Sequence, residues 1–114
     1  MNQISQMLMD ISQGYIDEGL SLVEQEHLMR SVGSAWNMAC FDPPERFNQL
    51  HQYMQNFKKN NNLSTDDYAS MEHNMMTLME QKDLLYPNEK IKVQDLQLAV
   101  KNGQIILSVS STKF

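Results

Sequence analysis

The feature that most constrains the fold is a change in the spacing of apolar residues near Pro87. Before Pro87, apolar residues recur every three or four positions, which is typical of the buried faces of helices. After it, they alternate with polar residues on both sides of Asn102-Gly103, which is typical of two strands joined by a tight turn. This order predicts an α+β fold that is mainly α, with a four-helix bundle-like N-terminal part followed by a C-terminal two-stranded antiparallel β-hairpin. The length of 114 residues fits one domain, residues 1–114.

Several start signals locate the helices. Ser21 and Glu24 have the spacing of a capping box, in which each side chain binds a free backbone donor at the helix start. Asp42 before Pro43 combines a capping residue with a proline suited to the first helical position. Ser64 precedes two aspartates and can cap a further helix. We therefore expect four helices, at about residues 3–18, 22–40, 43–59 and 65–85.

The periodic apolar residues of these helices define the expected core. Gly33 and Ala35 leave room for another helix to approach closely, and Trp36 should anchor the interior. Asn37 is a poor helix-interior residue, so we expect it to cap a break in the helix or to hydrogen-bond across the bundle, with a ligand contact as the less favoured alternative. The expected core positions are Ile4, Met7, Leu8, Ile11, Tyr15, Leu22, Met29, Val32, Trp36, Ala39, Cys40, Phe47, Leu50, Met54, Phe57, Tyr68, Met71, Met75, Leu78, Met79 and Lys82.

The hairpin can be predicted at residue level, with strands at about residues 91–100 and 104–111. A two-residue type I′ turn at Asn102-Gly103 places six apolar residues on one face of the hairpin. Its predicted cross-strand pairs are Val100 with Ile105, Leu98 with Leu107, and Leu96 with Val109. Ile91 and Val93 alternate in the opposite phase, which predicts a bulge or a bend near Gln94-Asp95. Because an isolated hairpin is marginally stable in water, its apolar face must cover the helices or its strands must pair with another chain.

Composition and charge exclude several classes of function. The formal net charge of −5 opposes the cationic surface that nucleic-acid binding requires, so no nucleic-acid partner is expected. No apolar run reaches the roughly 20 residues that cross a bilayer, and the first residues lack the pattern of a secretory signal. We therefore expect a cytoplasmic protein with no membrane partner. Cys40 is the only cysteine, and its apolar neighbours indicate a small buried hydrophobe rather than a nucleophile.

No recognisable catalytic motif or phosphate-binding loop is present, so we expect neither catalytic activity nor a cofactor. Glu24 and His27 have the Glu-x-x-His spacing of di-iron bundles, but that chemistry needs a second copy, which the sequence lacks. His51 and His73 lie on two other predicted helices. The alternative to a binding protein is therefore a metal- or small-molecule-binding bundle, in which Glu24, His27, His51 and His73 would have to converge in the interior.

A protein-binding role is the favoured interpretation. Methionines concentrate between residues 71 and 79, and flexible thioether side chains suit surfaces that accept varied apolar partners. Residues 65–85 also carry five acidic residues against one basic residue. The candidate partner surface comprises Met76, Glu72, Glu80, Asp83 and Ile106. We expect an adaptor, an immunity-type inhibitor or an assembly subunit. We favour a homodimer because symmetric pairing protects a two-stranded edge, although a helix of the same chain could protect that edge equally well.

Three segments also resemble parts of small bacterial proteins of unassigned function. These segments are Ala35-Trp36-Asn37-Met38-Ala39, Pro43-Pro44, and Lys82 with Leu85-Tyr86-Pro87. The resemblance covers about half of the chain. It implies a soluble bacterial protein and assigns no functional residue.

Overall fold

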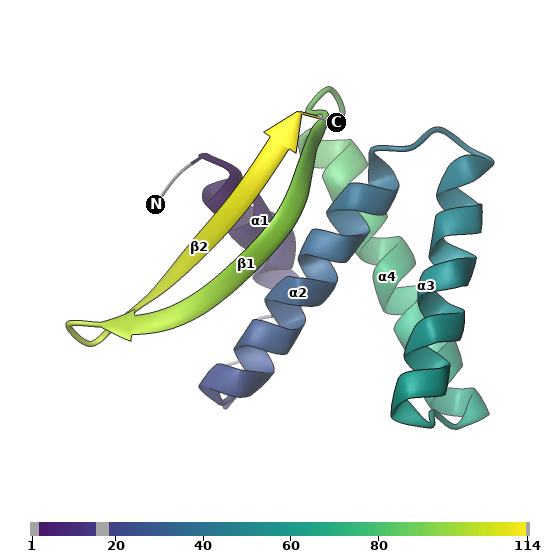
Figure 1. Ribbon diagram of the computed structural model, residues 1–114, viewed down its shortest axis with the longest axis horizontal. Coiled ribbons are helices and arrows are strands. Elements are labelled where there is room, and N and C mark those ends of the chain that lie inside the picture. The colour runs from purple at the N-terminus through teal and green to yellow at the C-terminus, as the bar shows by residue number, and fades with distance from the viewer. Residues whose placement is uncertain (1–2, 16–18, 114) are drawn as a thin grey trace.

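The computed structural model describes residues 3–15 and 19–113, and it confirms four helices followed by one antiparallel hairpin. Helix α2 is central, because it packs against the other three helices and against strand β1. The hairpin lies across α1 and α2, while α3 and α4 stand on the other side of α2 (Figure 1). The elements are α1 (Gln3–Ser12), the 3₁₀ helix η1 (Gln13–Tyr15), α2 (Leu22–Ala39), α3 (Glu45–Asn61), α4 (Thr65–Leu85), β1 (Ile91–Lys101) and β2 (Gln104–Lys113).

The predicted caps of α2 and α4 are confirmed. The Glu24 backbone N–H donates to Ser21 Oγ at 3.1 Å, and the Ser21 backbone N–H donates to the Glu24 carboxylate at 3.3 Å, which completes the capping box. At the start of α4, Ser64 Oγ accepts from the Asp67 backbone N–H at 3.1 Å. Helix α3 ends at Asn62, which adopts the left-handed conformation that asparagine tolerates. Local sequence signals therefore set most of the helix boundaries.

Two helix boundaries differ from the prediction. The first helix is α-helical only to Ser12, and it tightens into a 3₁₀ turn around Gly14, a residue that favours helix poorly; residues 16–18 lie outside the described residues. Helix α3 begins at Glu45 rather than at position 43, and its N-cap, Pro44, makes no side-chain capping bond. Pro43 precedes another proline, which disfavours the α conformation, so the predicted cap at Asp42 does not form.

The core contains most of the predicted positions, including Met75, Leu78 and Met79 of α4, and it also includes the charged residue Lys82. The predicted burial of Leu22 and Phe47 is wrong, because both side chains are exposed. Leu22 is the first residue of α2. Phe47 lies on α3, the helix at the edge of the fold, which buries only Leu50 and Met54.

The hairpin has the predicted register and the predicted bulge, which falls between Val93 and Asp95. Asn102 and Gly103 have φ angles of 53° and 77°, and a type I′ turn requires positive φ at both positions. The close approach expected at Gly33 is made by β1 rather than by a helix. A methyl group at position 33 would lie 3.1 Å from Leu96 Cδ2, so the glycine lets the hairpin pack directly on α2.

Candidate interaction site at the hairpin edge

Side chains of α2 occupy the outer edge of β1 near its start. Trp36 Nε1 donates to the Ile91 carbonyl oxygen at 2.6 Å. The Asn37 amide donates to the Val93 carbonyl oxygen and accepts from the Val93 backbone N–H, both at 2.8 Å. The amide of Asn37 therefore binds β1 as a neighbouring strand would. This resolves the expectations for Asn37 in favour of hydrogen bonding, with a strand as the partner.

Charged groups and the bulge cover the next part of β1. The Leu98 backbone N–H donates to the Glu26 carboxylate at 3.4 Å, and Arg30 lies 3.5 Å from the carboxylate of Asp95, the residue at the bulge. The exposed lysines of this strand are Lys92 and Lys101. Charges, bulges and covering elements are the means by which proteins prevent unwanted pairing at a sheet edge. Strand β1 has all three.

Strand β2 has fewer of these protections, although α1 packs against part of it. From Asn102 to Thr112 the chain has no charged residue and no proline. The register shift of the hairpin adds its extra residue to β1, so β2 carries no bulge. The described residues form one sheet of two strands, in which β2 has β1 on one side only. An uncharged, regular edge strand presents a template for pairing with a further strand.

The turn determines which backbone groups of β2 are directed away from β1. Because Lys101 and Gln104 flank a two-residue turn as a hydrogen-bonded pair, the N–H and C=O groups of Ile105 and Leu107 point outward. Within the described part of the chain, no hydrogen bond from outside the hairpin reaches the backbone of these two residues. Ile106 lies between them, with its backbone groups directed to β1 and its half-buried side chain on the outer face of the hairpin. We call residues 105–107 the open edge.

An exposed apolar patch adjoins the open edge. The hairpin tip projects past the helices (Figure 1), so Val100 and Ile105 remain 58% and 45% exposed although they belong to the inner, apolar face. At the start of α2, Leu22 and Val23 are also exposed, by 39% and 64%. We call the cross-strand pair Val100 and Ile105 the tip patch.

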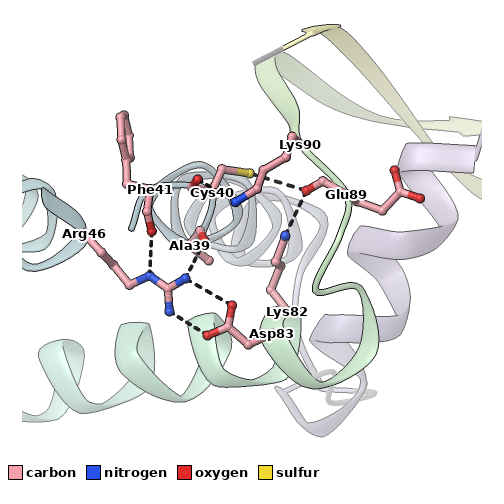
Figure 2. Close-up of polar contacts among 8 residues, drawn as sticks. All are labelled: Ala39, Cys40, Phe41, Arg46, Lys82, Asp83, Glu89 and Lys90. Carbon is pink, nitrogen blue, oxygen red and sulfur yellow. Dashed lines mark hydrogen bonds and ion pairs between the residues drawn. The ribbon is translucent and has the colours of Figure 1, made fainter. Parts of the chain in front are cut away.

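An ion pair fixes the opposite end of the helices. Arg46 and Asp83 make a two-pronged contact at 2.6 and 3.2 Å, which joins α3 to α4. The same guanidinium donates to the carbonyl oxygens of Ala39 and Phe41 at the end of α2 (Figure 2). A planar guanidinium suits this use, because its several donors are held in one fixed geometry. Arg46 therefore links three helices at one point.

Buried polar contacts hold the segment that leads into β1. Lys82 is 1% exposed, and its ammonium group donates to the Glu89 carbonyl oxygen at 2.8 Å and lies 5.0 Å from the centre of the Trp36 ring. The ammonium of Lys90 donates to the Cys40 carbonyl oxygen at 3.0 Å (Figure 2). These contacts fix residues 89 and 90 against α2 and α4. They therefore set the direction in which the hairpin leaves the helices.

Burial changes the acidity of two groups in this region. It lowers the pKa of the Lys82 ammonium, and it raises the pKa of the Cys40 thiol despite the nearby positive charges of Lys82 and Lys90. Cys40 Sγ lies 3.7 Å from the carbonyl oxygens of Glu89 and Ile91. A buried thiol with a raised pKa is a poor nucleophile, which agrees with the expected packing role of Cys40.

The structure does not bring the five predicted partner residues onto one surface. Glu72, Met76 and Glu80 follow one stripe of α4, where Met76 is 37% exposed and Glu80 is exposed. Asp83 continues that stripe, but its carboxylate is committed to the ion pair on α3. Ile106 lies apart from them on β2. The acidic stripe of α4 remains a predicted partner surface. Ile106, which was predicted as a partner residue, lies on the open edge, whereas the neighbouring Ile105, Leu107 and the tip patch were not named as site residues.

The residues of the predicted metal alternative do not converge. Glu24, His27, His51 and His73 are exposed on three helices, although this alternative required them in the interior. The described residues contain no group of three or more His, Cys, Asp or Glu side chains placed to hold a metal ion.

An apolar depression lined by His27 lies between α2, α3 and α4. It has a volume of about 380 Å³ and includes Leu28, Met71 and the stacked rings of Tyr53 and Phe57, whose centres are 5.9 Å apart. Its charged rim residue, Arg30, is already paired with acidic side chains of α2 and β1.

Comparison of the chain with protein-family models, with curated proteins and with solved structures gave no match. None of the helices in the described ranges combines the length and apolar character needed to cross a bilayer. The fold and the candidate site define an α+β domain with one protected and one open strand edge.

Proposed function

We propose that this chain is a small, acidic, non-catalytic protein–protein interaction module that binds its partner by strand addition to β2. The observation that carries this proposal is the difference between the two edges of the hairpin. Edge β1 is bonded to α2 and carries a bulge and charges, whereas the open edge of β2 has none of these. An adaptor, an immunity-type inhibitor or an assembly subunit acting in the cytoplasm would each use such an edge.

Strand addition also accounts for the arrangement of side chains around the open edge. In this mode, backbone hydrogen bonds supply affinity and alternating side chains supply specificity. Ile105 and Leu107 would offer backbone groups to the partner, while Ile106 would offer an apolar side chain on the outer face. The tip patch adds exposed apolar surface beside the same edge. A partner strand could therefore gain backbone bonds and apolar burial together.

Native mass spectrometry of the protein isolated from its own host tests the proposal. The variant Ile105→Pro removes the outward N–H at position 105 without removing a bond within the hairpin. The matched control Ile105→Val keeps that N–H and an apolar side chain. We expect the wild type and the Val variant to retain a second polypeptide chain, and the Pro variant to lose it while keeping its far-ultraviolet circular dichroism spectrum.

Two results would contradict a protein-binding role. One is a wild-type spectrum that contains only the mass of the single chain. The other is a metal or small-molecule adduct that persists in Ile105→Pro, because it would favour a ligand-binding role instead.

A further inference from the structure

We propose that the partner of β2 is a second copy of this chain, and that the two β2 strands pair antiparallel about a two-fold axis at Ile106. The sheet of the dimer would have the strand order β1, β2, β2 and β1, with the two open edges joined at its centre. This inference rests on the proposed function and identifies the partner that the open edge binds.

Charge favours this contact between two copies. Each chain has a formal net charge of −5, so two copies repel one another over most of their surfaces. Helix α4 would oppose acidic residues to acidic residues, and β1 would oppose lysines to lysines in a symmetric contact. The segment from Asn102 to Thr112 is uncharged, so a symmetric contact there places no like charges opposite each other.

The open edge selects one register. Among the described residues, Ile105 and Leu107 have outward backbone groups without a partner outside the hairpin, whereas Val109 already takes part in a further interaction. A two-fold axis at Ile106 places Ile105 of each copy opposite Leu107 of the other. Each of these opposed pairs exchanges two backbone hydrogen bonds, so every outward group of the open edge finds a partner. The register makes no demand on Val109.

Side chains around the axis are self-complementary. Ile106 would face its own copy as a non-hydrogen-bonded pair, in which Cα atoms lie about 4.5 Å apart and side chains are closest. Ile106 is the large apolar residue on an outer face that β2 otherwise fills with small or polar residues, so two copies would cover each other's isoleucine. The other outer-face residues of β2 are Gln104, Ser108, Ser110 and Thr112.

The inner face and the shape of the fold are compatible with the same axis. Ile105, which is 45% exposed, would gain Leu107 of the second copy as a neighbour on the inner face. The axis lies three residues from the turn, and the hairpin tip projects past the helices (Figure 1). The two helical parts would therefore extend in opposite directions from the paired tips.

A charge-exchange experiment tests the axis. In Ile106→Lys and in Ile106→Glu, two like charges would face each other across the axis, so each variant should dimerise at least ~10-fold more weakly than the wild type. An equimolar mixture of the two variants should recover the dimer, because opposite charges then face each other. Ala99→Lys is the matched control, since position 99 lies beside Ile106 on the outer face but on β1. Sedimentation velocity over a concentration series measures the dimerisation of the wild type, of each variant and of the mixture.

Amide hydrogen exchange adds a second readout on the wild-type protein. The N–H groups of Ile105 and Leu107 should become protected as protein concentration rises, whereas the N–H of Ile106 is already bonded to β1 and should not change.

The proposal is overturned if the wild type sediments as a monomer at every concentration, or if a dimer forms that neither charge at position 106 weakens. The failure of the dimer and the failure of the interaction module are distinguishable. A wild-type monomer that retains a different polypeptide in native mass spectra, and loses it in Ile105→Pro, keeps the module and excludes the second copy.

Discussion

Replacing Asn37 with alanine should destabilise the protein by about 1.5 kcal/mol, a value that follows from its two bonds to β1. The amide satisfies both the N–H and the C=O of Val93, which is 8% exposed. An unsatisfied buried group costs ~1–3 kcal/mol, and the lower end applies because Asn37 is only half-buried. The substitution leaves two such groups on Val93, so the total loss is about 2 kcal/mol. Alanine returns about 0.5 kcal/mol through its higher helix propensity.

Urea unfolding measures this change. With a slope of about 1–3 kcal/mol/M for a small domain, the midpoint should fall by roughly 0.5–1.5 M while the slope stays constant. Asn48→Ala is the matched control, because Asn48 is exposed on α3 and its side chain makes no hydrogen bond within the described chain. Asn48→Ala should therefore gain only the stabilisation of about 0.5 kcal/mol that comes from the higher helix propensity of alanine. The reasoning is refuted if both variants shift the midpoint equally.

Three further predictions concern other contacts. Tyr86 Oη donates to Asp10 at 2.6 Å and lowers the pKa of that carboxyl, so the stabilisation is present above about pH 4 and is lost as pH falls through the lowered pKa. Tyr86→Phe should therefore flatten the acid limb of a profile of unfolding free energy against pH. The thiol of Cys40 should react slowly with a disulfide reagent in the native protein and rapidly in urea, and equal rates would contradict its burial. Gly33→Val should cost about 1–3 kcal/mol in urea unfolding because β1 leaves no space, whereas Gly14→Ala, with open space around it, should be neutral or stabilising.

The fold could be predicted because its main determinants are local. The Ser21 capping box, the Asn102-Gly103 turn and the alternation of the strands each depend on a few neighbouring residues. The position of the turn predicted the register of the hairpin. The apolar pattern supported the same register, because a slip by one residue would mix serines into the apolar face. The start of α3 was misplaced because two local preferences competed. Pro43 suits the first position of a helix, but a residue that precedes proline disfavours the α conformation, and the second preference prevailed.

The placement of the hairpin on α2 could not be predicted from neighbouring residues. The bonds from Trp36 and Asn37 to β1 join positions 55 and 56 residues apart, and helix periodicity does not report the direction of a partner. The same limit explains why Gly33 was assigned to a helix contact. The burial of Lys82 could be predicted, because this residue occupies a position of the apolar stripe of α4. Its hydrogen-bond acceptor, the Glu89 carbonyl oxygen, could not be predicted because it lies on a loop.

The difference between the two strand edges becomes visible only in the structure. The second strand was predicted at about residues 104–111 and runs from Gln104 to Lys113, and its lack of charge up to Thr112 is visible in the sequence. That lack gains meaning only beside β1, whose edge is occupied by α2. From the sequence, both edges were equivalent candidates, whereas the structure distinguishes them.

The anchoring of β1 should also affect dimerisation, although no anchoring residue would touch the second copy. A strand that is already held in place loses little conformational freedom when another strand pairs with it. Asn37→Ala should therefore weaken the dimer by at most ~10-fold, the factor that corresponds to about 1.5 kcal/mol, and Asn48→Ala should leave it unchanged. Sedimentation of the two variants measures the effect. A dimer stronger in Asn37→Ala than in the wild type would show instead that partner binding requires the hairpin to leave α2.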